Sequence, residues 1–264
     1  MENVQLTVNE GIATLVINRP KQLNALNKQT LAEISEAFES MRNDDGVKVV
    51  IMTGSGEKAF VAGADIKEFA NFSGVQGSEL AKTGHMTVFN SIEEFSKPVI
   101  AAINGAAAGL GLVQALMCDM RFAADTAKFT VAFSKRGLIG EYGISWVLPR
   151  LVGQANALDL MMSSRVVMAN EAQQMGMVNK VVPADQLMDV VLAYAADLAM
   201  NVSPSSMAVM KRQVYSDYEK DVSSASKEAL RLMQESFTRS DFKEGVQSFL
   251  QKRQAEFPPV HPNA

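Results

Sequence analysis

Two short apolar runs restrict the fold more than any other feature of the sequence: VKVVIMTG at residues 47–54 and PVIAAI at residues 98–103. Runs of this kind are typical of strands that are buried on both faces, as in parallel sheets. Apolar residues at helical spacing precede the first run, at residues 31–38, and GLVQALM follows the second run, at residues 111–117. This alternation of strands and helices predicts an α/β domain with mostly parallel pairing.

The two ends of the chain differ from this central pattern. Alternating apolar residues around an Asn-Glu-Gly turn predict an opening hairpin at residues 4–17. The last third has only helical spacings, and the pair Asp241 and Glu244 predicts a capping box at the start of a final helix. We therefore predict an α/β core at residues 1–185 and a helical region at 186–264, whose apolar faces we expect to meet other subunits.

Composition and charge disfavour several classes of function. With 25 Lys and Arg residues against 29 Asp and Glu residues, the chain lacks the basic surface that nucleic-acid binding requires. Its two histidines, His85 and His261, are far apart in the sequence, and we predict no metal site. The single cysteine, Cys118, can form no disulfide within the chain, and the amino terminus has no signal-peptide pattern. Both features favour a cytoplasmic protein.

The strongest membrane candidate is the uncharged stretch at residues 98–118. Its length approaches the roughly 20 residues that a membrane-spanning helix needs. Asn104-Gly105 is, however, a strong turn signal in its middle, and no basic or aromatic belt flanks it. We therefore predict a buried strand, a turn and a buried helix here, and no contact with a membrane.

The segment FVAGADIKEF at residues 60–69 joins a strand end, a run of small residues and a helix start. Asp65 and the glutamate three residues later have the spacing of an N-cap and its partner, so we interpret Asp65 as a helix cap rather than a catalytic acid. The functional candidates are backbone N–H groups, because Ala62, Gly63 and Ala64 leave the chain accessible to a ligand.

A second segment of the same kind is NGAAAGLGL at residues 104–112. Gly109-Leu110-Gly111 suggests a dinucleotide loop, but the third glycine of that motif would fall at Gln114, so this interpretation fails. Close helix packing and contact with a ligand both remain open as explanations of the small residues. Two such helix starts can aim two backbone donors at one oxygen, where each donor is worth roughly 3 kcal/mol as charge develops. An oxyanion hole of this kind favours enolate chemistry on an activated carbonyl, such as a thioester.

Several segments, in their order and spacing, resemble the enoyl-CoA hydratase/isomerase (crotonase) superfamily. They are NALN at 24–27, FVAGADIKEF, AINGAAAGLG, CDMRFAADTAKF, GLIGEYGISWVLPRLVG, EAQQMGMVNKVV and FKEGVQSFLQKRQAEF. The resemblance extends from about Leu6 to Phe257. It implies a crotonase-like ββα spiral core with a helical C-terminal trimerisation region. It also implies a homotrimer or a dimer of trimers, and an acyl-CoA ligand with no cofactor beyond the coenzyme A of the substrate.

The resemblance also assigns roles to individual residues. The N–H groups of Ala64 and Leu110 would hold the thioester oxygen. The adenine would lie near Ala62, and the pantetheine near Ala25 and Leu26. Gly63 and Gly109 would belong to the same substrate-binding surface.

Two glutamates of the standard hydratases in this family are missing. Their positions hold Val113 and Phe133 here, and neither side chain can activate water or supply a proton. We expect these two residues to make the acyl pocket drier and suited to an apolar or unsaturated chain.

Glu141, in GLIGEYGISW, is the remaining candidate for proton transfer. Family members that move a double bond place a single acid in or near this turn. One carboxylate is enough for such an isomerase, because it removes a proton from one carbon and returns it to another. We expect burial among apolar neighbours, including Ile139, to raise the pKa of Glu141. The alternative is a turn acid or a cap of a helix that begins near Gly143.

Other polar residues are weaker candidates. We interpret Asp119 and Arg121 as a structural pair or cap, and Lys135 with Arg136 as a solvated pair. The second pair retains an alternative as a ligand of a coenzyme A phosphate. His85 is a minor candidate for substrate contact, within a possible lid at residues 71–90.

We therefore predict an enoyl-CoA double-bond isomerase in which Glu141 is the sole acid/base. Hydration of a 2-enoyl-CoA by Glu141 and a bound water is the main alternative, and thioester hydrolysis is a third reaction. A non-catalytic acyl-CoA-binding protein is the alternative from another class, because both standard glutamates are missing.

Overall fold

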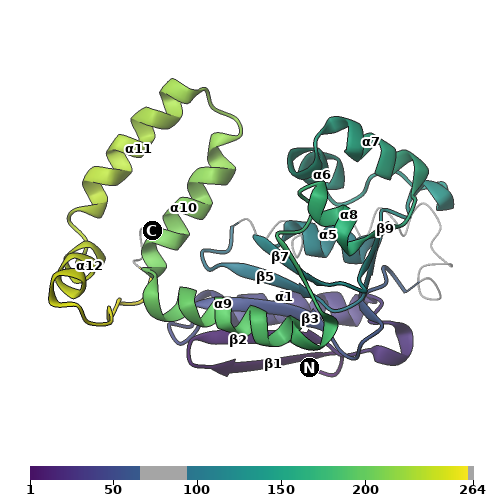
Figure 1. Cartoon of the computed structure of the whole chain (residues 1–264), viewed down its shortest axis with the longest axis horizontal. Helices are drawn as coiled ribbons and strands as arrows, with labels where there is room; N and C mark the ends of the chain where they lie inside the picture. Colours follow the sequence, from purple (N-terminus) through teal and green to yellow (C-terminus); the bar gives the residue numbers. More distant parts are fainter. Residues whose placement is uncertain (66–93, 261–264) are drawn as a thin grey trace.

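The computed structural model describes residues 1–65 and 94–260 (Figure 1). Its larger sheet has six strands, paired in the order β1 (Val4–Asn9), β2 (Ile12–Ile17), β3 (Val49–Gly54), β5 (Val99–Ile103), β7 (Met120–Ala124) and β10 (Lys180–Val182). The opening hairpin β1–β2 is antiparallel, and the other neighbours are parallel. The predicted hairpin and the predicted parallel α/β core are both confirmed.

Three of the four strands of the smaller sheet come directly after strands of the larger sheet. Its order is β4 (Ala59–Val61), β6 (Ala106–Ala108), β8 (Lys128–Thr130) and β9 (Val167–Met168). The consecutive pairs β3–β4, β5–β6 and β7–β8 each contribute one strand to each sheet. With α5 (Leu110–Met117) after β6, this is the strand–strand–helix repeat that the resemblance implies.

Helices cover the two faces of the larger sheet because successive side chains of a strand point to opposite faces. Ile51 packs in one apolar cluster with residues of α9 (Leu187–Asn201). Its neighbours Val50 and Met52 belong to the other cluster, which includes residues of α1 (Lys28–Arg42) and α5. Continuous apolar strands therefore lie between two helical layers, as their sequence indicates.

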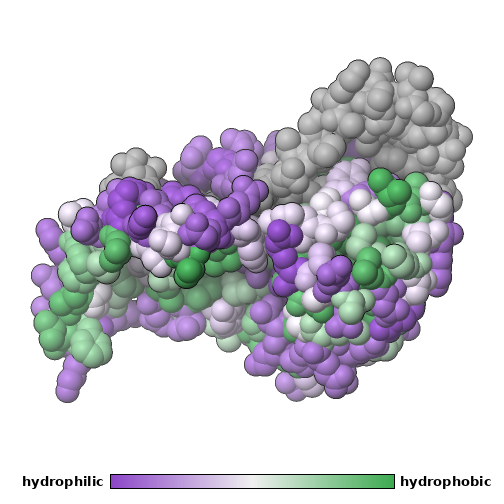
Figure 2. Space-filling model, turned by 90° about the horizontal axis from the view of Figure 1, so that it is seen from above, coloured by the Kyte–Doolittle hydropathy of each residue, from purple (hydrophilic) through white to green (hydrophobic). Residues whose placement is uncertain are grey.

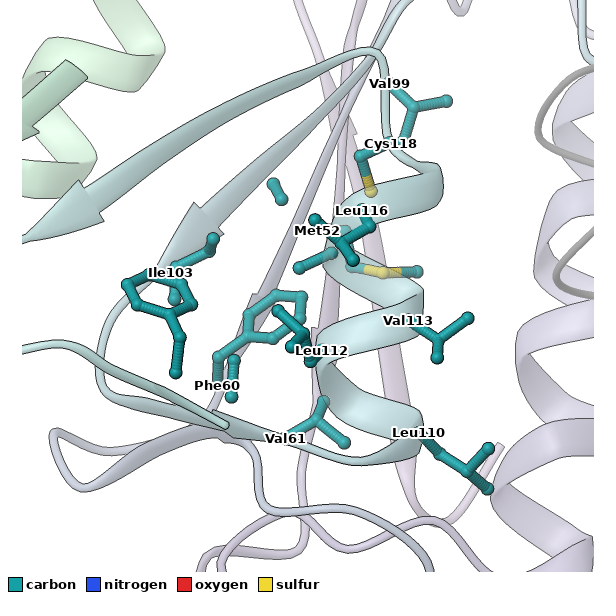
Figure 3. Packing of buried hydrophobic residues seen from close by; sticks show 14 of the residues in the cluster. Met52, Phe60, Val61, Val99, Ile103, Leu110, Leu112, Val113, Leu116 and Cys118 are labelled. Carbon is teal, nitrogen blue, oxygen red and sulfur yellow. The ribbon is translucent and has the colours of Figure 1, made fainter. Parts of the chain in front are cut away.

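Helix α5 lies unusually close to the smaller sheet. Leu112 is on the side of the helix that faces Phe60, whereas Val113 points to the opposite side (Figure 3). A Cβ atom added at Gly111 would lie only 1.9 Å from the carbonyl oxygen of Val61. Gly111 therefore permits close helix packing, one of the two explanations considered above for the small residues. This packing brings the start of α5 next to β4.

The uncharged stretch at residues 98–118 forms β5, β6 and α5, which confirms the strand, turn and helix predicted there. Within the described ranges, no helix is long and apolar enough to cross a membrane. The cytoplasmic location stays a prediction.

The remaining helices follow the two sheets. They are η1 (Pro20–Gln22), η2 (Ser134–Arg136), α6 (Ile144–Val152), α7 (Gln154–Ser163), α8 (Ala169–Gln174), η3 (Ala184–Gln186), α10 (Pro204–Asp217), α11 (Val222–Ser236) and α12 (Ser240–Gln251). Helices α10 to α12 extend away from the sheets (Figure 1). Apolar side chains are visible at the end of the molecule that carries α11 and α12 (Figure 2). The boundary at residues 185 and 186 stays a prediction, and α9 packs against the sheet.

The capping box predicted for the last helix is wrong. The N-cap of α12 is Arg239, and its side chain forms no capping hydrogen bond. Asp241 instead accepts a hydrogen bond from Ser203 Oγ, and Glu244 forms an ion pair with Arg253. Asp241 thus pairs with a residue 38 positions away, whereas Glu244 pairs with Arg253, nine positions further along, because a guanidinium is a stronger partner than a backbone N–H.

Asp119 and Arg121 have the structural roles expected of them, but they do not form the predicted pair. Asp119 forms an ion pair of 2.8 Å with Lys211 and accepts a hydrogen bond from the N–H of Val99. The Arg121 side chain donates to backbone carbonyls, including that of Met177. Sequence proximity was misleading here, because α10 brings a closer cation to Asp119.

Candidate functional site

A cavity of about 420 Å³ lies between the strands of the smaller sheet and the start of α5. Its lining residues are Ala62, Gly63, Ala64, Ala108, Gly109, Leu110, Thr130, Ala132, Phe133, Lys135, Arg136, Leu138, Glu141, Ser164 and Val166. The cavity therefore brings together seven predicted site residues from four separate segments. Ala25, Leu26 and Val113 do not line it.

The N–H of Ala64 points away from the neighbouring chain segment. Leu26 donates its N–H to Gly63 O at 2.8 Å, and Leu26 O accepts the N–H of Asp65 at 2.8 Å. Ala64 is the bridge residue between these two bonds, so its own N–H points to the other side, where the cavity lies. Gly63 has a φ of 116°, and an added Cβ would lie 3.1 Å from Ala108 O.

The N–H of Leu110 is the second backbone donor. Leu110 is the first residue of α5, and its N–H has no partner within the helix. Gly109 precedes it with φ 51° and ψ −120°, and no side chain caps this end of the helix. Both donors thus follow a glycine with a positive φ, and both face one cavity. The positive end of the dipole of α5 adds to the attraction for an anionic oxygen.

An ion pair holds the segment that carries Ala64. Arg19 Nη2 lies 3.0 Å from Asp65 Oδ2, with the two side chains only 12% and 18% exposed. The same guanidinium donates to the carbonyl of Ala25. Asp65 therefore connects the loop before α1 to the segment that carries Ala64. Its predicted role as a helix cap involves residues outside those described.

Glu141 is half-buried and lines the cavity. Its carbonyl accepts the N–H of Ile144 at 3.1 Å, and the two residues between them, Tyr142 and Gly143, have φ values of 51° and 76°. Positive φ in a non-glycine residue such as Tyr142 is strained and occurs often at functional sites. This tight turn positions Glu141 immediately before α6.

Burial raises the pKa of the Glu141 carboxyl group. The apolar neighbour Ile139 does not cause this burial, because it is 80% exposed. Glu141 does not cap α6, whose N-cap is Gly143 without any side-chain hydrogen bond. Among the described residues, Glu141 is the only carboxylate that lines the cavity.

Phe133 and Val113, which we expect at the positions of two family glutamates, lie in different places. Phe133 is 5% exposed and lines the cavity beside Gly109, where an added Cβ would lie 3.8 Å from its Cε1 atom. Val113 is fully buried in the apolar core. A phenyl ring therefore forms this part of the cavity wall.

Two hydroxyl residues that line the cavity, Thr130 and Ser164, were missed by sequence reasoning, and Ser134 lies behind them in the same hydrogen-bonded cluster. Thr130 Oγ1 donates to Ser164 O at 3.1 Å, Ser134 Oγ donates to Met162 O at 3.0 Å, and the Ser134 and Ser164 hydroxyls lie 2.7 Å apart. Ser164 is 1% exposed and has a φ of 46°. The sequence carries no signal for this cluster, because the fold alone brings β8 and the end of α7 together.

Lys135 and Arg136 of η2 place positive charge at the exposed edge of the cavity. Arg136 Nη1 donates to Ala132 O at 2.9 Å. His85 and the predicted lid at residues 71–90 lie outside the described residues.

Comparisons with known proteins agree with this arrangement. The sequence pattern of the family described as Enoyl-CoA hydratase/isomerase matches residues 7–259. A crotonyl-CoA hydratase of Syntrophomonas wolfei is 40% identical over 97% of this chain and 98% of its own length. A short-chain-enoyl-CoA hydratase of Clostridium acetobutylicum is 36% identical over 97% of each chain. The crystal structure of an enoyl-CoA hydratase from Bacillus anthracis superimposes with a TM-score of 0.93 at 30% identity, covering 97% of this chain and 99% of that one.

Proposed function

The chain belongs to the enoyl-CoA hydratase/isomerase family, and from this premise we propose that it moves the double bond of an enoyl-CoA thioester through an enolate. The observation that carries the proposal is the meeting of two backbone donors and a single carboxylate in one cavity. The crotonase-like fold itself is shown by the close superposition on a solved hydratase.

The oxyanion hole would consist of the N–H groups of Ala64 and Leu110. Removal of a proton from the α-carbon of a thioester places negative charge on the thioester oxygen. Two preorganised donors stabilise that charge, and each is worth roughly 3 kcal/mol in sites of this kind. Gly63 and Gly109 orient the two peptide planes that carry these donors.

Glu141 would transfer the proton. Its carboxylate removes the α-proton of a 3-enoyl-CoA, and the electron pair of the broken C–H bond enters a dienolate held by the two N–H groups. The carboxylic acid then returns the proton to the γ-carbon, the double bond now lies between the α- and β-carbons, and Glu141 is again ionised. This sequence requires one acid/base and no further cofactor.

Hydration of a 2-enoyl-CoA is the second candidate. The similar proteins favour it, since the relatives with 40% and 36% identity are both named hydratases. Glu141 would then take a proton from a bound water and deliver one to the α-carbon, in place of the two standard glutamates. Val113 and Phe133 leave no other acid at those positions.

Coenzyme A would lie along the segments around Ala62 and Leu26. Leu26 itself is 0% exposed and bonded to Gly63 O, so the predicted pantetheine contact would fall on the partly exposed Ala25 beside it rather than on Leu26. Ala25 lies next to it and is held by Arg19. Arg136 and its neighbour Lys135 would place positive charge beside a phosphate group of the coenzyme A.

We further propose a homotrimer or a dimer of trimers. Support comes from α12, where Phe249 and Leu250 are 82% and 73% exposed in the single chain. Large apolar side chains with this exposure are expected at contacts between subunits.

The test is turnover of a 3-enoyl-CoA and a 2-enoyl-CoA by the purified protein and its Glu141→Gln variant, followed by absorbance and mass spectrometry. Conversion of the 3-enoyl substrate without a change in mass, lost in the variant, supports the isomerase. Gain of one water by the 2-enoyl substrate supports the hydratase. Binding of both without turnover would identify an acyl-CoA-binding protein instead.

A further inference from the structure

A second cavity, of about 380 Å³, lies where α6, α9 and α10 meet the start of β7. It is nearly as large as the cavity that Glu141 lines, and the described residues of the two linings have no member in common. Leu116 and Val147 belong to the second lining and are 2% and 7% exposed, so the apolar core forms part of its wall. This cavity is therefore a separate site, of a size that small molecules occupy.

Three aromatic residues belong to the lining of this second cavity. Trp146 of α6 stacks against Tyr215 of α10, with ring centroids 6.5 Å apart and planes inclined by 16°. Tyr218 meets the Trp146 ring edge to face at 5.3 Å. The aromatic cluster thus joins α6 to α10 at the cavity, and together with the aliphatic lining it offers an apolar surface to a ligand.

The guanidinium of Arg150 packs against the same aromatic cluster. Its Cζ atom lies 4.2 Å from the ring centroid of Trp146 and 5.2 Å from that of Tyr218, the geometry of cation–π contacts. One N–H donates to Trp146 O at 2.9 Å, and the other four N–H groups of the guanidinium have no acceptor among the described residues. Arg150 is exposed and lines the cavity. A guanidinium oriented in this way matches the two oxygens of a carboxylate.

The lining of the second cavity carries more positive than negative charge. Within the described ranges, Asp119 is its one carboxylate, and Lys211 lies 2.8 Å from it. Arg121 is 5% exposed, and the acceptors of its side chain in the described part of the chain are neutral backbone carbonyls. Arg121 and Arg150 are therefore two cations of the lining without a carboxylate partner there, and this charge favours an anionic ligand.

We propose that the second cavity binds a monocarboxylate with an apolar body. The carboxylate accepts N–H groups of Arg150, and the apolar body lies against the aromatic and aliphatic lining. Arg121 contributes its charge from within the protein. The proposal goes beyond the enoyl-CoA reaction and does not depend on it, because the two cavities have separate linings.

The single tryptophan of the chain reports on this cavity. Trp146 lines it and does not line the cavity of Glu141, so a ligand bound here should change the tryptophan fluorescence. The experiment titrates octanoate, and octanol as its uncharged counterpart, into three proteins. These are the wild type, Arg150→Gln, and Arg212→Gln, which removes an exposed charge of α10 outside the lining.

We expect octanoate to change the fluorescence of the wild type with saturation. Arg150→Gln should weaken octanoate binding about tenfold, the usual effect of losing one hydrogen bond to a charged group. The affinity for octanol should be the same in all three proteins, and Arg212→Gln should bind octanoate as the wild type does. Met210→Glu places a carboxylate at a lining position that is 63% exposed, and it should also weaken octanoate binding. This variant supplies the test if Arg150→Gln does not fold.

The proposal is overturned if octanoate causes no saturable change, or if Arg150→Gln weakens the binding of octanoate and octanol equally. Light scattering of the same proteins covers the remaining occupant. A wild type that binds no octanoate, together with an Arg150→Gln variant of smaller mass, would assign the cavity to a contact between subunits. Enoyl-CoA turnover enters none of these results, so failure of this proposal and failure of the proposed reaction are distinguishable.

Discussion

At the scale of single residues, two glycines determine where the backbone donors of the cavity point. Gly63 and Gly109 have φ values of 116° and 51°, which side-chain-bearing residues rarely adopt. Each glycine sets the peptide plane that carries the next N–H, on Ala64 and on Leu110. The small residues of these segments therefore serve the orientation of donors as well as the close packing of α5.

We predict that Gly109→Ala lowers kcat at least tenfold. A Cβ atom would fit, since its nearest neighbour would lie at 3.8 Å, so the effect comes from backbone strain of roughly 1–3 kcal/mol that rotates the Leu110 N–H. Gly153→Ala is the matched control, because Gly153 also has a positive φ and open surroundings but does not line the cavity. Steady-state kinetics and thermal unfolding of both variants would show whether kcat falls only in Gly109→Ala.

The raised pKa of Glu141 predicts the acidic limb of the pH–activity profile. Burial favours the protonated form, so a carboxylate ready to accept the α-proton appears only at higher pH than for an exposed glutamate. We expect kcat/KM for a 3-enoyl-CoA to fall as pH decreases, with a midpoint above the ordinary glutamate range. Glu219→Gln, which removes an exposed acid, should retain this limb. A limb at the ordinary glutamate pKa would contradict the assignment.

At the scale of elements, hydrogen bonds to Glu33 connect the start of β1 to α1. Its carboxylate accepts the N–H groups of Glu2, Asn3 and Val4 at 3.0, 2.8 and 2.9 Å. Burial alone would raise the pKa of Glu33, but these bonds and one from Gln29 outweigh it, and the pKa is lowered. The contact therefore stabilises the fold above the ordinary glutamate pKa, and this stability is lost as pH falls through the lowered value.

We predict that Glu33→Gln lowers the free energy of unfolding at neutral pH by about 1–3 kcal/mol, because charged acceptors form stronger hydrogen bonds. The difference from the wild type should shrink as pH falls below the ordinary glutamate range, where Glu33 becomes protonated in both states. Urea unfolding at fixed protein concentration over a series of pH values measures this. Glu36→Gln, at an exposed position of the same helix, is the control. A difference that does not change with pH would show that the charge is not responsible.

Most elements could be predicted because their signals are local. The apolar runs of β3 and β5 identify strands buried on both faces, and they are buried throughout. The capping box failed because the spacing of Asp241 and Glu244 also occurs inside a helix, where partners outside the first turn, Ser203 and Arg253, decide their contacts.

The parts of the site with a local sequence signal could be predicted, and the parts that only the fold brings together could not. Small residues before a helix indicate backbone donors, and Glu141 stands out as an acid among apolar residues. Thr130 and Ser164 gave no signal, because they are 34 residues apart in sequence and only the fold joins them. Contacts of this kind depend on tertiary packing and have no local pattern.

At the scale of the whole molecule, the helices beyond the sheet present apolar side chains that a single chain leaves exposed (Figure 2). We predict that Leu250→Glu breaks the proposed trimer, because it places a charge at an apolar contact. Size-exclusion chromatography with light scattering would then give one chain mass instead of three or six. Gln251→Glu, also exposed on α12, should keep the wild-type mass. A wild-type protein that is monomeric at micromolar concentration would refute the proposed assembly.

The central claim is that Glu141 alone transfers the proton while Ala64 and Leu110 hold the enolate oxygen. The measurement that tests it most directly is mass analysis of a 3-enoyl-CoA incubated with the protein in deuterated water that also contains labelled oxygen. We predict deuterium at the α- or γ-carbon without labelled oxygen in the wild type, and neither label in Glu141→Gln. Deuterium exchange that persists in Glu141→Gln, or labelled oxygen in the wild-type product, would contradict this account.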